Sequence, residues 1–326
     1  MYYINNRGHL GVRGYCGKGV QHMKLYANLH NHTTHSDGVY SPREIVEVAK
    51  KEGYGAFAVT DHDTVTACRE VKAECEKQGL EWIFGAEFSS PCKSLGTNFH
   101  ILGFHFDPEF PEMKSYLEQR SYCEAHQTRV LFERGVAEGN ISGIDWQEVL
   151  EFNRGITWIC NEHVFRAMKA KGLKTDTDYP EFFSKVYGRR RSQVVPPFEF
   201  LPAEEIVALI RRAGGIAIVA HPHNQLRFAD ELVKMGVEGL EVWHHMLNDD
   251  ERDEALRVAL KYDMLVSGGA DHAGLCGGQY SRYAEPEKTG FYFEPCTLGT
   301  MKAFFDEIKS GARMPDRADV IKSLIK

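Results

Sequence analysis

The sequence predicts an α/β fold with a largely parallel sheet, and two observations lead to this prediction. Short apolar segments recur along the chain and most end in a cluster of polar residues, while segments with helical periodicity lie between many of them. Such strand–helix alternation is typical of α/β proteins. With 326 residues, 43% of them hydrophobic, the chain is long enough for one large domain or for one domain that carries an insertion.

Seven segments have the character of buried strands, because they are short, apolar and enriched in β-branched or aromatic residues. In chain order they cover residues 25–32, 54–63, 80–90, 97–107, 215–223, 239–245 and 263–272. Helices are expected between them at 41–53, 64–79 and 201–215, where apolar residues recur at helical spacing and a glycine closes each segment.

The middle of the chain departs from this alternation. Residues 108–196 show successive helical patterns and hardly a strand, so we expect a mainly helical insertion between two parts of the core, 24–107 and 197–326. Residues 1–23 are rich in Gly and Asn, and their apolar residues recur neither at helical nor at strand spacing. We expect a disordered extension there, with Met23 as a candidate functional start.

Composition and charge exclude several classes of protein. The formal net charge of −7 argues against long nucleic acids as partners, and no apolar run approaches the ~20 residues that span a membrane. The N-terminus lacks the apolar region of a secretory signal, and the eight cysteines form no CxxC pair. We therefore expect a cytoplasmic protein with reduced thiols.

The most informative residues are the polar ones at or near the ends of the predicted strands. They are, in chain order, His30, His32, Asp61, His62, Asp63, Glu87, His100, His221, Asp271 and His272. Because the carboxyl ends of parallel strands in a barrel meet at one mouth, side chains far apart in sequence can converge there. Incidental histidines in a polar turn could explain one such motif, but not the whole ordered set.

The residue types indicate the chemistry of this mouth. Imidazole and carboxylate ligands without thiolate suit Mn, Fe or Zn, and alternate residues of a strand, such as His30 and His32, point to the same face. The donors outnumber the four to six that one ion takes, so two or three divalent metal ions are expected. Close-set metals generate hydroxide near neutral pH and support displacement at phosphorus.

Six motifs carry a resemblance to a known family. They are HNHTTHSDG at 30–38, TDHD at 60–63, GAE at 85–87, HILG at 100–103, AHP at 220–222 and GGAD at 268–271. In this order they resemble the motifs of the PHP-domain (polymerase and histidinol phosphatase) metallo-phosphoesterases. The resemblance runs from about residue 24 to 280 and is closest to the bacterial branch of nucleoside 3′,5′-bisphosphate phosphatases and short-RNA 5′-exonucleases. It implies a distorted (β/α)7 barrel of PHP type with a trinuclear metal centre.

The resemblance also implies a role for each motif residue. It assigns His30, His32, Glu87 and Asp271 to a first metal, Asp37 and His62 to a second, and Glu87, His100 and His221 to a third. A metal-bridging hydroxide would attack phosphorus, which gives Asp37 and His62 a catalytic as well as a ligand role.

The last motif departs from the family. It normally reads Asp-x-His, with the histidine on the second metal, whereas this chain has Asp271-His272-Ala273. Either His272 reaches that metal after a local shift of the backbone, or the second site lacks one ligand. His35 in the first motif is a further candidate for the missing ligand.

Two arginines that could hold a phosphate in related enzymes are absent. The Gly-Arg that commonly follows AHP is His223-Asn224 here, and an Arg-Pro-His of the insertion is Asn161-Glu162-His163. His223 and His163 become candidates for binding substrate or protonating the leaving oxygen, although His163 could equally be a helix-surface residue. Lys185 and Arg189 match a Lys…Gly-Arg segment of the relatives and are candidate phosphate ligands.

We therefore expect metal-dependent hydrolysis of a phosphate monoester, with a small nucleotide of the 3′,5′-bisphosphate type as substrate. A variant of this chemistry is 5′-to-3′ trimming of short oligonucleotides. An amide or C–N hydrolase on a related barrel is a second class, but those enzymes usually carry a metal-bridging lysine that no strand end offers here. A degenerate metal-binding regulatory module is the third, favoured only by the missing histidine of the last motif.

Overall fold

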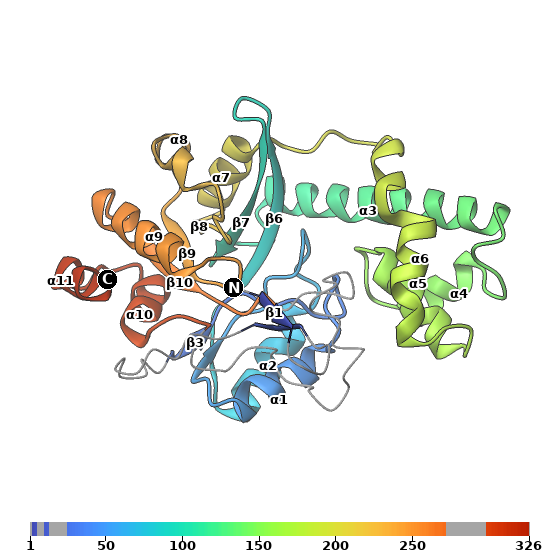
Figure 1. Ribbon diagram of the computed structural model, residues 1–326, viewed down its shortest axis with the longest axis horizontal. Coiled ribbons are helices and arrows are strands. Elements are labelled where there is room, and N and C mark those ends of the chain that lie inside the picture. The colour runs from blue at the N-terminus through green and yellow to red at the C-terminus, as the bar shows by residue number, and fades with distance from the viewer. Residues whose placement is uncertain (1, 5–9, 13–24, 272–297, 326) are drawn as a thin grey trace.

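The computed structural model describes residues 2–4, 10–12, 25–271 and 298–325, which form an α/β core with a helical lobe on one side (Figure 1). Each predicted strand segment contains at least one strand. Segment 80–90 contains two, β5 (Glu81–Trp82) and β6 (Gly85–Cys92), which belong to different sheets. Residues 2–4 and 10–12 form a short antiparallel pair, β1 (Tyr2–Ile4) with β2 (Leu10–Val12).

The larger sheet has five strands in the order β10-β9-β8-β7-β6. Besides β6, these are β7 (Thr97–Phe104), β8 (Ile216–Val219), β9 (Gly239–Trp243) and β10 (Leu265–Gly268). The strands β8, β9 and β10 run parallel, but β7 is antiparallel to both of its neighbours, which departs from the largely parallel sheet expected. The reason is local: residues 93–96 are too few for the long crossover that a parallel pair requires, so β6 and β7 form a hairpin.

The smaller sheet is fully parallel and meets the larger one at two places. It consists of β3 (Ala27–Asn28), β4 (Ala56–Phe57) and β5. Beyond β3, the Asp271 amide donates to the carbonyl of His30 at 2.8 Å, and beyond β4 the Asp63 amide donates to the carbonyl of Glu87 at 2.8 Å. These bonds bring the ends of strands from both sheets to one place.

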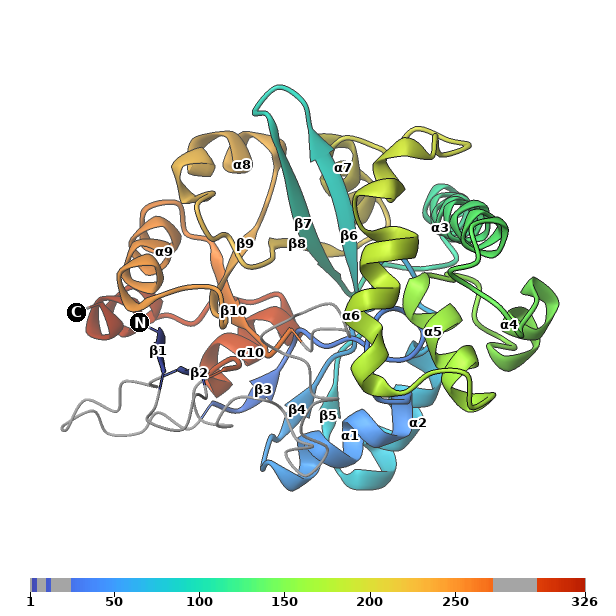
Figure 2. The same ribbon diagram turned by 45° about the vertical axis from the view of Figure 1, so that its right-hand side comes forward.

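Helices pack on the outside of both sheets (Figure 2). They are α1 (Pro42–Lys51), α2 (Cys68–Gln78), α7 (Ala203–Arg212), α8 (Ala229–Met235), α9 (Asp249–Lys261), α10 (Lys302–Ser310) and α11 (Arg317–Leu324), with a 3₁₀ turn at Leu226–Phe228. Two of these helices begin or end at the capping residue that the sequence predicts. Ser41 and Glu44 form a capping box on α1, and Gly79 closes α2 in the left-handed conformation at φ 68°.

The middle of the chain forms the helical lobe. It contains α3 (Pro111–Ala137), α4 (Trp146–Phe152), α5 (Asn161–Ala170) and α6 (Tyr179–Phe182), a π turn at Phe183–Tyr187, and 3₁₀ turns at Asp176–Asp178 and Gly188–Gln193. The lobe has a hydrophobic cluster of its own, which includes Phe132, Phe165 and Phe182. Among the described helices, none combines the length and the apolar character that crossing a membrane would demand.

Candidate metal centre

Glu87, near the start of β6, lies at the centre of the polar cluster, and its side chain is 1% exposed. Its Oε2 faces three imidazoles, at 3.4 Å from His30 Nε2, 3.2 Å from His32 Nε2 and 3.0 Å from His62 Nδ1. Its Oε1 faces two others, at 2.9 Å from His100 Nδ1 and 3.2 Å from His221 Nε2. One carboxylate therefore separates the histidines into two groups.

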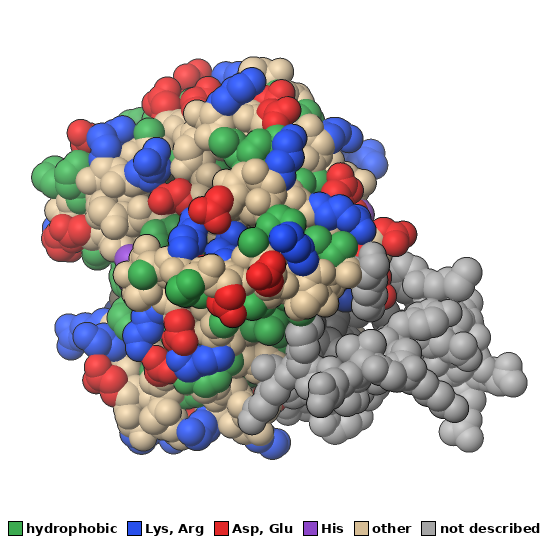
Figure 3. All heavy atoms as spheres, turned by 90° about the vertical axis from the view of Figure 1, so that its left-hand side faces the viewer, with side chains coloured by type: hydrophobic (Ala, Val, Ile, Leu, Met, Phe, Trp, Pro, Cys, Tyr) green, Lys and Arg blue, Asp and Glu red, His purple; other side chains and the backbone are tan. Residues whose placement is uncertain are grey.

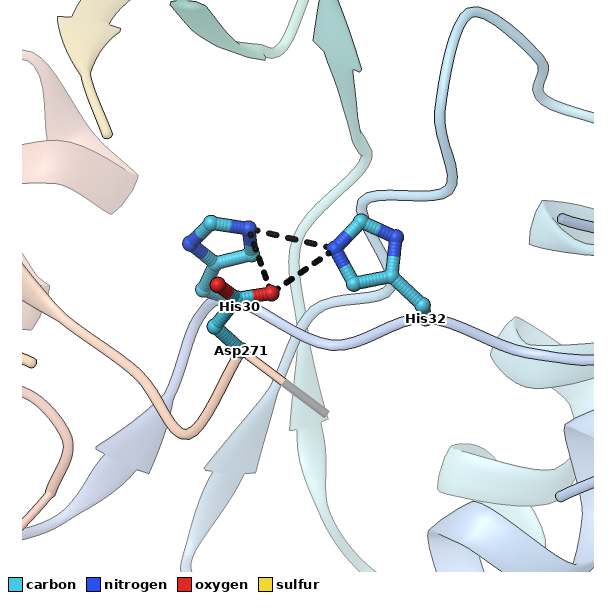
Figure 4. A group of neighbouring side chains, drawn as sticks. All are labelled: His30, His32 and Asp271. Carbon is cyan, nitrogen blue, oxygen red and sulfur yellow. Dashed lines mark hydrogen bonds and ion pairs between the residues drawn. The ribbon is translucent and has the colours of Figure 1, made fainter. Parts of the chain in front are cut away.

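Asp271 completes the first of these groups (Figure 4). Its Oδ1 lies 3.6 Å from His30 Nε2 and 3.2 Å from His32 Nε2, and these two nitrogens lie 3.2 Å from each other. Figure 4 shows the two rings and the carboxylate pointing toward a common centre. Asp37 approaches from the side, with 3.6 Å from Oδ1 to His32 Nδ1 and 3.9 Å from Oδ2 to His62 Nε2.

The loop that carries the first motif is fixed by Asp61, the first acid of TDHD. Asp61 is buried and accepts hydrogen bonds from the Thr33 amide at 2.7 Å, the Thr33 hydroxyl at 2.8 Å and the Ser36 hydroxyl at 2.5 Å. This acid therefore orients residues 33–36 and presents Asp37 to the cluster. His35 turns to Thr66, with 2.8 Å between Nδ1 and Oγ1, and belongs to none of the groups of clustered ligand atoms among the described residues.

Two residues behind the cluster hold its members in place. Glu241 in β9 is fully buried, lies 3.1 Å from His30 Nδ1 and accepts the His221 amide at 2.8 Å. When the His30 ring is neutral, its Nδ1–H donates to this carboxylate and its Nε2 keeps a lone pair for a metal ion. His244 accepts the Met246 amide at Nδ1, so its Nε2–H donates to Asp271 Oδ2 at 3.1 Å.

The cluster has the charge pattern of a cation site. Burial would lower the pKa of His30 and His32, but the surrounding carboxylates outweigh burial and raise both pKa values well above the usual range. Burial would raise the pKa of Glu87, but the neighbouring imidazoles hold it well below its usual value. Glu87 Oε2 is buried and has no hydrogen-bond partner among the described residues, so a lone pair remains available. Imidazole and carboxylate donors in this arrangement fit divalent ions.

Three groups of residues from the six motifs place one ligand atom each within 4.8 Å of the others, close enough to hold a metal ion. They are His30, His32 and Asp271; His32, His62 and Glu87; and Glu87, His100 and His221. His30 and Glu241 also form a group with His244, and His244 and His245 form one with Asp271. His272 lies outside the described residues.

A cavity of about 340 Å³ adjoins the cluster. Asp37, His62 and His100 line it on the side of the cluster. The remaining lining includes aromatic residues and two arginines, namely Trp158, Phe183, Tyr187, Phe200, Arg120 and Arg191. Its size lies within the range of pockets that bind small molecules.

The other candidate substrate residues lie elsewhere. His163 is buried, with Nδ1 accepting the Cys160 amide at 3.0 Å and Nε2 donating to the Thr34 carbonyl at 3.0 Å. His223 Nδ1 lies 2.6 Å from Glu251 Oε1, and Lys185 pairs with Glu181 at 2.6 Å. Arg189 is exposed. None of these four is among the residues that line the cavity.

Sequence reasoning missed Glu241, Arg120 and Trp158. Glu241 could have been found, since it is a lone charge in the apolar segment 239–243. Arg120 and Trp158 carry no such signal, because a charged residue in a helix and an aromatic residue in a loop are common.

Comparisons with known proteins agree with this geometry. Residues 28–134 match the PHP domain family. A 5′-3′ exoribonuclease of Haemophilus influenzae is 28% identical over 77% of this chain and 90% of its own. A phosphoribosyl 1,2-cyclic phosphate 1,2-diphosphodiesterase of Eggerthella lenta is 27% identical over 78% and 96%, and a 3′,5′-nucleoside bisphosphate phosphatase of Chromobacterium violaceum 26% over 77% and 89%.

The fold has solved counterparts. A crystal structure from Bifidobacterium adolescentis, described as a metal-dependent phosphoesterase, superposes with a TM-score of 0.68 at 25% identity and covers 89% of this chain and 98% of its own. The motifs, the buried ligand cluster and these relatives lead to one conclusion: residues 28–134 match the PHP domain, and the chain is similar over most of its length to metal-dependent phosphoesterases.

Proposed function

We propose that this protein hydrolyses a phosphate monoester of a small nucleotide, with a nucleoside 3′,5′-bisphosphate as the best-fitting class. The observation that carries the proposal is the cavity of about 340 Å³ between the ligand cluster and a wall of aromatic side chains and arginines. A reacting phosphate fits the side of Asp37 and His62. A base can stack on the aromatic side, where Trp158 already lies 6.0 Å from the His62 ring in a stacked orientation.

Two or three divalent ions (Mn, Fe or Zn) are the cofactors in this proposal. His30, His32, Glu87 and Asp271 would hold the first, Asp37 and His62 the second, and Glu87, His100 and His221 the third, with His272 as a further candidate ligand. Such ions supply a nucleophile near neutral pH and offset the charge that develops on phosphorus. Glu241 and His244 keep the ligands in the correct tautomer and orientation.

The proposal includes an architecture. We infer that the two sheets together correspond to the distorted (β/α)7 barrel of PHP proteins, supported by the bonds from Asp271 to His30 and from Asp63 to Glu87 between them. Residues 108–196 would form the insertion that covers the mouth, with 24–107 and 197–326 as the core. The separate hydrophobic cluster of the lobe supports this division.

Short oligonucleotides are the second candidate substrate, and one observation favours them. A second cavity of about 410 Å³ shares Arg120 and Phe200 with the first. Nearby, the Tyr122 and Phe198 rings lie tilted to each other with 6.0 Å between their centres, and the two residues are 57% and 43% exposed. Such aromatic pairs accept unpaired bases. Long polymers fit less well, since the formal net charge of the chain is −7. On the face shown in Figure 3, cationic and anionic side chains are intermixed over the described atoms.

The test is hydrolysis of a panel of phosphate esters by Mn-reconstituted protein, followed as free phosphate and, for the RNA, as released mononucleotide. The panel contains nucleoside 3′,5′-bisphosphates, mononucleotides, 5′-phosphorylated short RNA, phosphoribosyl 1,2-cyclic phosphate and histidinol phosphate. We expect release from one nucleotide class and a loss of about 100-fold or more in Asp37→Asn, because losing even an outer-shell partner costs 10–100-fold. Asp250→Asn, an exposed acid of α9, is the matched control and should keep full activity. Release from no ester by the wild-type protein would contradict the proposal.

A further inference from the structure

Arg120 of α3 has an unusual environment for an arginine. Its side chain is 5% exposed, and its Nη2 donates to Asp63 Oδ2 at 2.7 Å. Its Nε and Nη1 are buried and make no hydrogen bond with any residue in the described part of the chain. Buried donors without partners are costly and rare in native proteins, so these N–H groups call for an acceptor.

The position of Arg120 puts its side chain in the wall of the substrate cavity. Asp63 directly follows His62, so the ion pair fastens the guanidinium beside the ligand cluster. Arg120 lines the cavity together with Asp37 and His100. The Phe200 ring lies 3.8 Å from the guanidinium carbon and holds its plane, which limits the directions in which Nε and Nη1 can donate.

Arg191, the other arginine of the cavity, is committed elsewhere. It pairs with Glu124, whose side chain is fully buried. Arg120 is also neutralised, by Asp63, so its recognition of a ligand depends on directed N–H donation more than on net charge. An anion with several acceptor oxygens, such as a phosphate group, matches the unused donors.

We propose that Arg120 binds the phosphate of the substrate that is not cleaved. This inference rests on the proposed function and adds the determinant of substrate choice. Both candidate substrates offer Arg120 a second phosphate. In a nucleoside bisphosphate it is the other phosphate, and in a short oligonucleotide it is the next internucleotide phosphate. Arg120 lines both the cavity beside the cluster and the neighbouring one, so either phosphate can reach it.

The test compares Arg120→Lys with the wild-type protein on three substrates: adenosine 3′,5′-bisphosphate, a 5′-phosphorylated dinucleotide, and p-nitrophenyl phosphate, which has one phosphate. Lysine can keep the ion pair with Asp63 but loses the planar set of donors. We expect KM to rise by about 10- to 100-fold for the substrates with a second phosphate, with kcat and the hydrolysis of p-nitrophenyl phosphate changed by less than about twofold. A larger rise in KM for the bisphosphate than for the dinucleotide identifies a nucleoside bisphosphate as the ligand of Arg120, and a larger rise for the dinucleotide identifies an oligonucleotide.

Arg129→Lys is the matched control, since Arg129 lies on the same helix and pairs on the surface with Glu133 at 2.8 Å. It should leave all three substrates unchanged. Arg120→Gln, which gives up the ion pair, should show the same selectivity as Arg120→Lys, and melting temperatures report whether both variants fold. An equal loss on all three substrates, or no loss, would overturn the role of Arg120 while leaving the phosphatase proposal intact.

Direct binding separates this inference from turnover. Calorimetric titration of metal-free protein with adenosine 3′,5′-bisphosphate should show affinity that falls by about 10-fold or more in Arg120→Lys. Equal affinity in the two proteins, or no binding to the wild type, would contradict the inference even if no ester is hydrolysed.

Discussion

Glu87 shows how one residue can organise a whole site. Its two oxygens face different imidazoles, His30, His32 and His62 on one side and His100 and His221 on the other, all within 2.9–3.4 Å. A shorter or neutral side chain at this position could not serve both groups. The residues behind the cluster matter as well, because a metal ligand binds well only when its other atoms are held.

Glu241→Gln tests this support at the residue scale. The change keeps the shape of the side chain but replaces the carboxylate that accepts from His30 Nδ1 and from the His221 amide. We expect metal affinity to fall by about 10- to 100-fold, measured by competition with a chelator. Glu205→Gln, on the exposed face of α7, is the control and should bind metal as the wild type does. Unchanged affinity in Glu241→Gln would mean that the negative charge of Glu241 is not needed to support His30 as a ligand.

At the scale of elements, the helices owe part of their stability to local signals. The capping box of α1 joins the Ser41 side chain to the Glu44 amide at 3.3 Å and the Glu44 carboxylate to the Ser41 amide at 2.9 Å. Ser41→Ala removes the first bond and should lower the free energy of unfolding by about 1 kcal/mol, read from urea denaturation. Ser41→Asp retains a capping oxygen and should recover most of the loss. Metal content should be the same in all three proteins, and a fall in Ser41→Ala would show that α1 also positions the ligand loop.

A second prediction at this scale concerns the contact between β3 and the segment after β10. A Cβ on Gly269 would lie 2.4 Å from His30 Cβ and 2.4 Å from its backbone nitrogen, so the strand end that carries the ligands would have to move. We expect Gly269→Ala to lower both stability, by about 1–3 kcal/mol or more, and metal content.

Gly135→Ala is the control for that change. Gly135 lies inside α3, and the nearest atoms to its Cβ are the ends of the Ile141 and Val186 side chains at 3.0–3.2 Å. The free energy of unfolding of Gly135→Ala should differ from that of the wild type by less than about 1 kcal/mol, because alanine favours a helix and the neighbouring side chains can shift. Thermal melting and metal analysis of both variants provide the comparison. Full metal content in Gly269→Ala would show that the close packing is not needed for the site.

At the scale of the whole molecule, two sheets and a helical lobe surround a cluster that is charged before any metal binds. Burial would lower the pKa of His30 and His32, yet Glu241, Asp271, Glu87 and Asp37 outweigh it and raise both pKa values well above the usual range. The carboxylates therefore favour retention of protons on both rings in the metal-free protein. A divalent ion has to displace them, since only the neutral imidazole is a ligand.

Metal binding should therefore release protons and strengthen as pH rises. The sign follows from the raised pKa values: below them the proton competes with the ion, and above them it does not. Calorimetry of Mn²⁺ binding in buffers of different ionisation enthalpy measures the number of protons released, and His30→Ala should release fewer. Heat that is independent of the buffer would show that the rings are already neutral in the metal-free protein.

The sequence alone determined a large part of this description. Apolar segments with helical or strand character placed the main elements, because burial and local propensity act over a few residues at a time. The ordered motifs identified the residues that converge on Glu87, since ligand types and strand ends are written directly in the chain. The assignment of individual metals and substrate contacts stays a prediction.

Only the tertiary structure decided which residues stand behind and around that cluster. The support from Glu241 for His30 and the buried pair of Arg120 with Asp63 depend on contacts between residues 211 and 57 positions apart. A single buried Arg in a helix such as α3 has no spacing that distinguishes it from a surface charge, and a lone Glu in an apolar strand does not reveal which residue it supports. Its role arises from the low-dielectric surroundings that the folded chain creates, where each charge and each N–H group needs a partner.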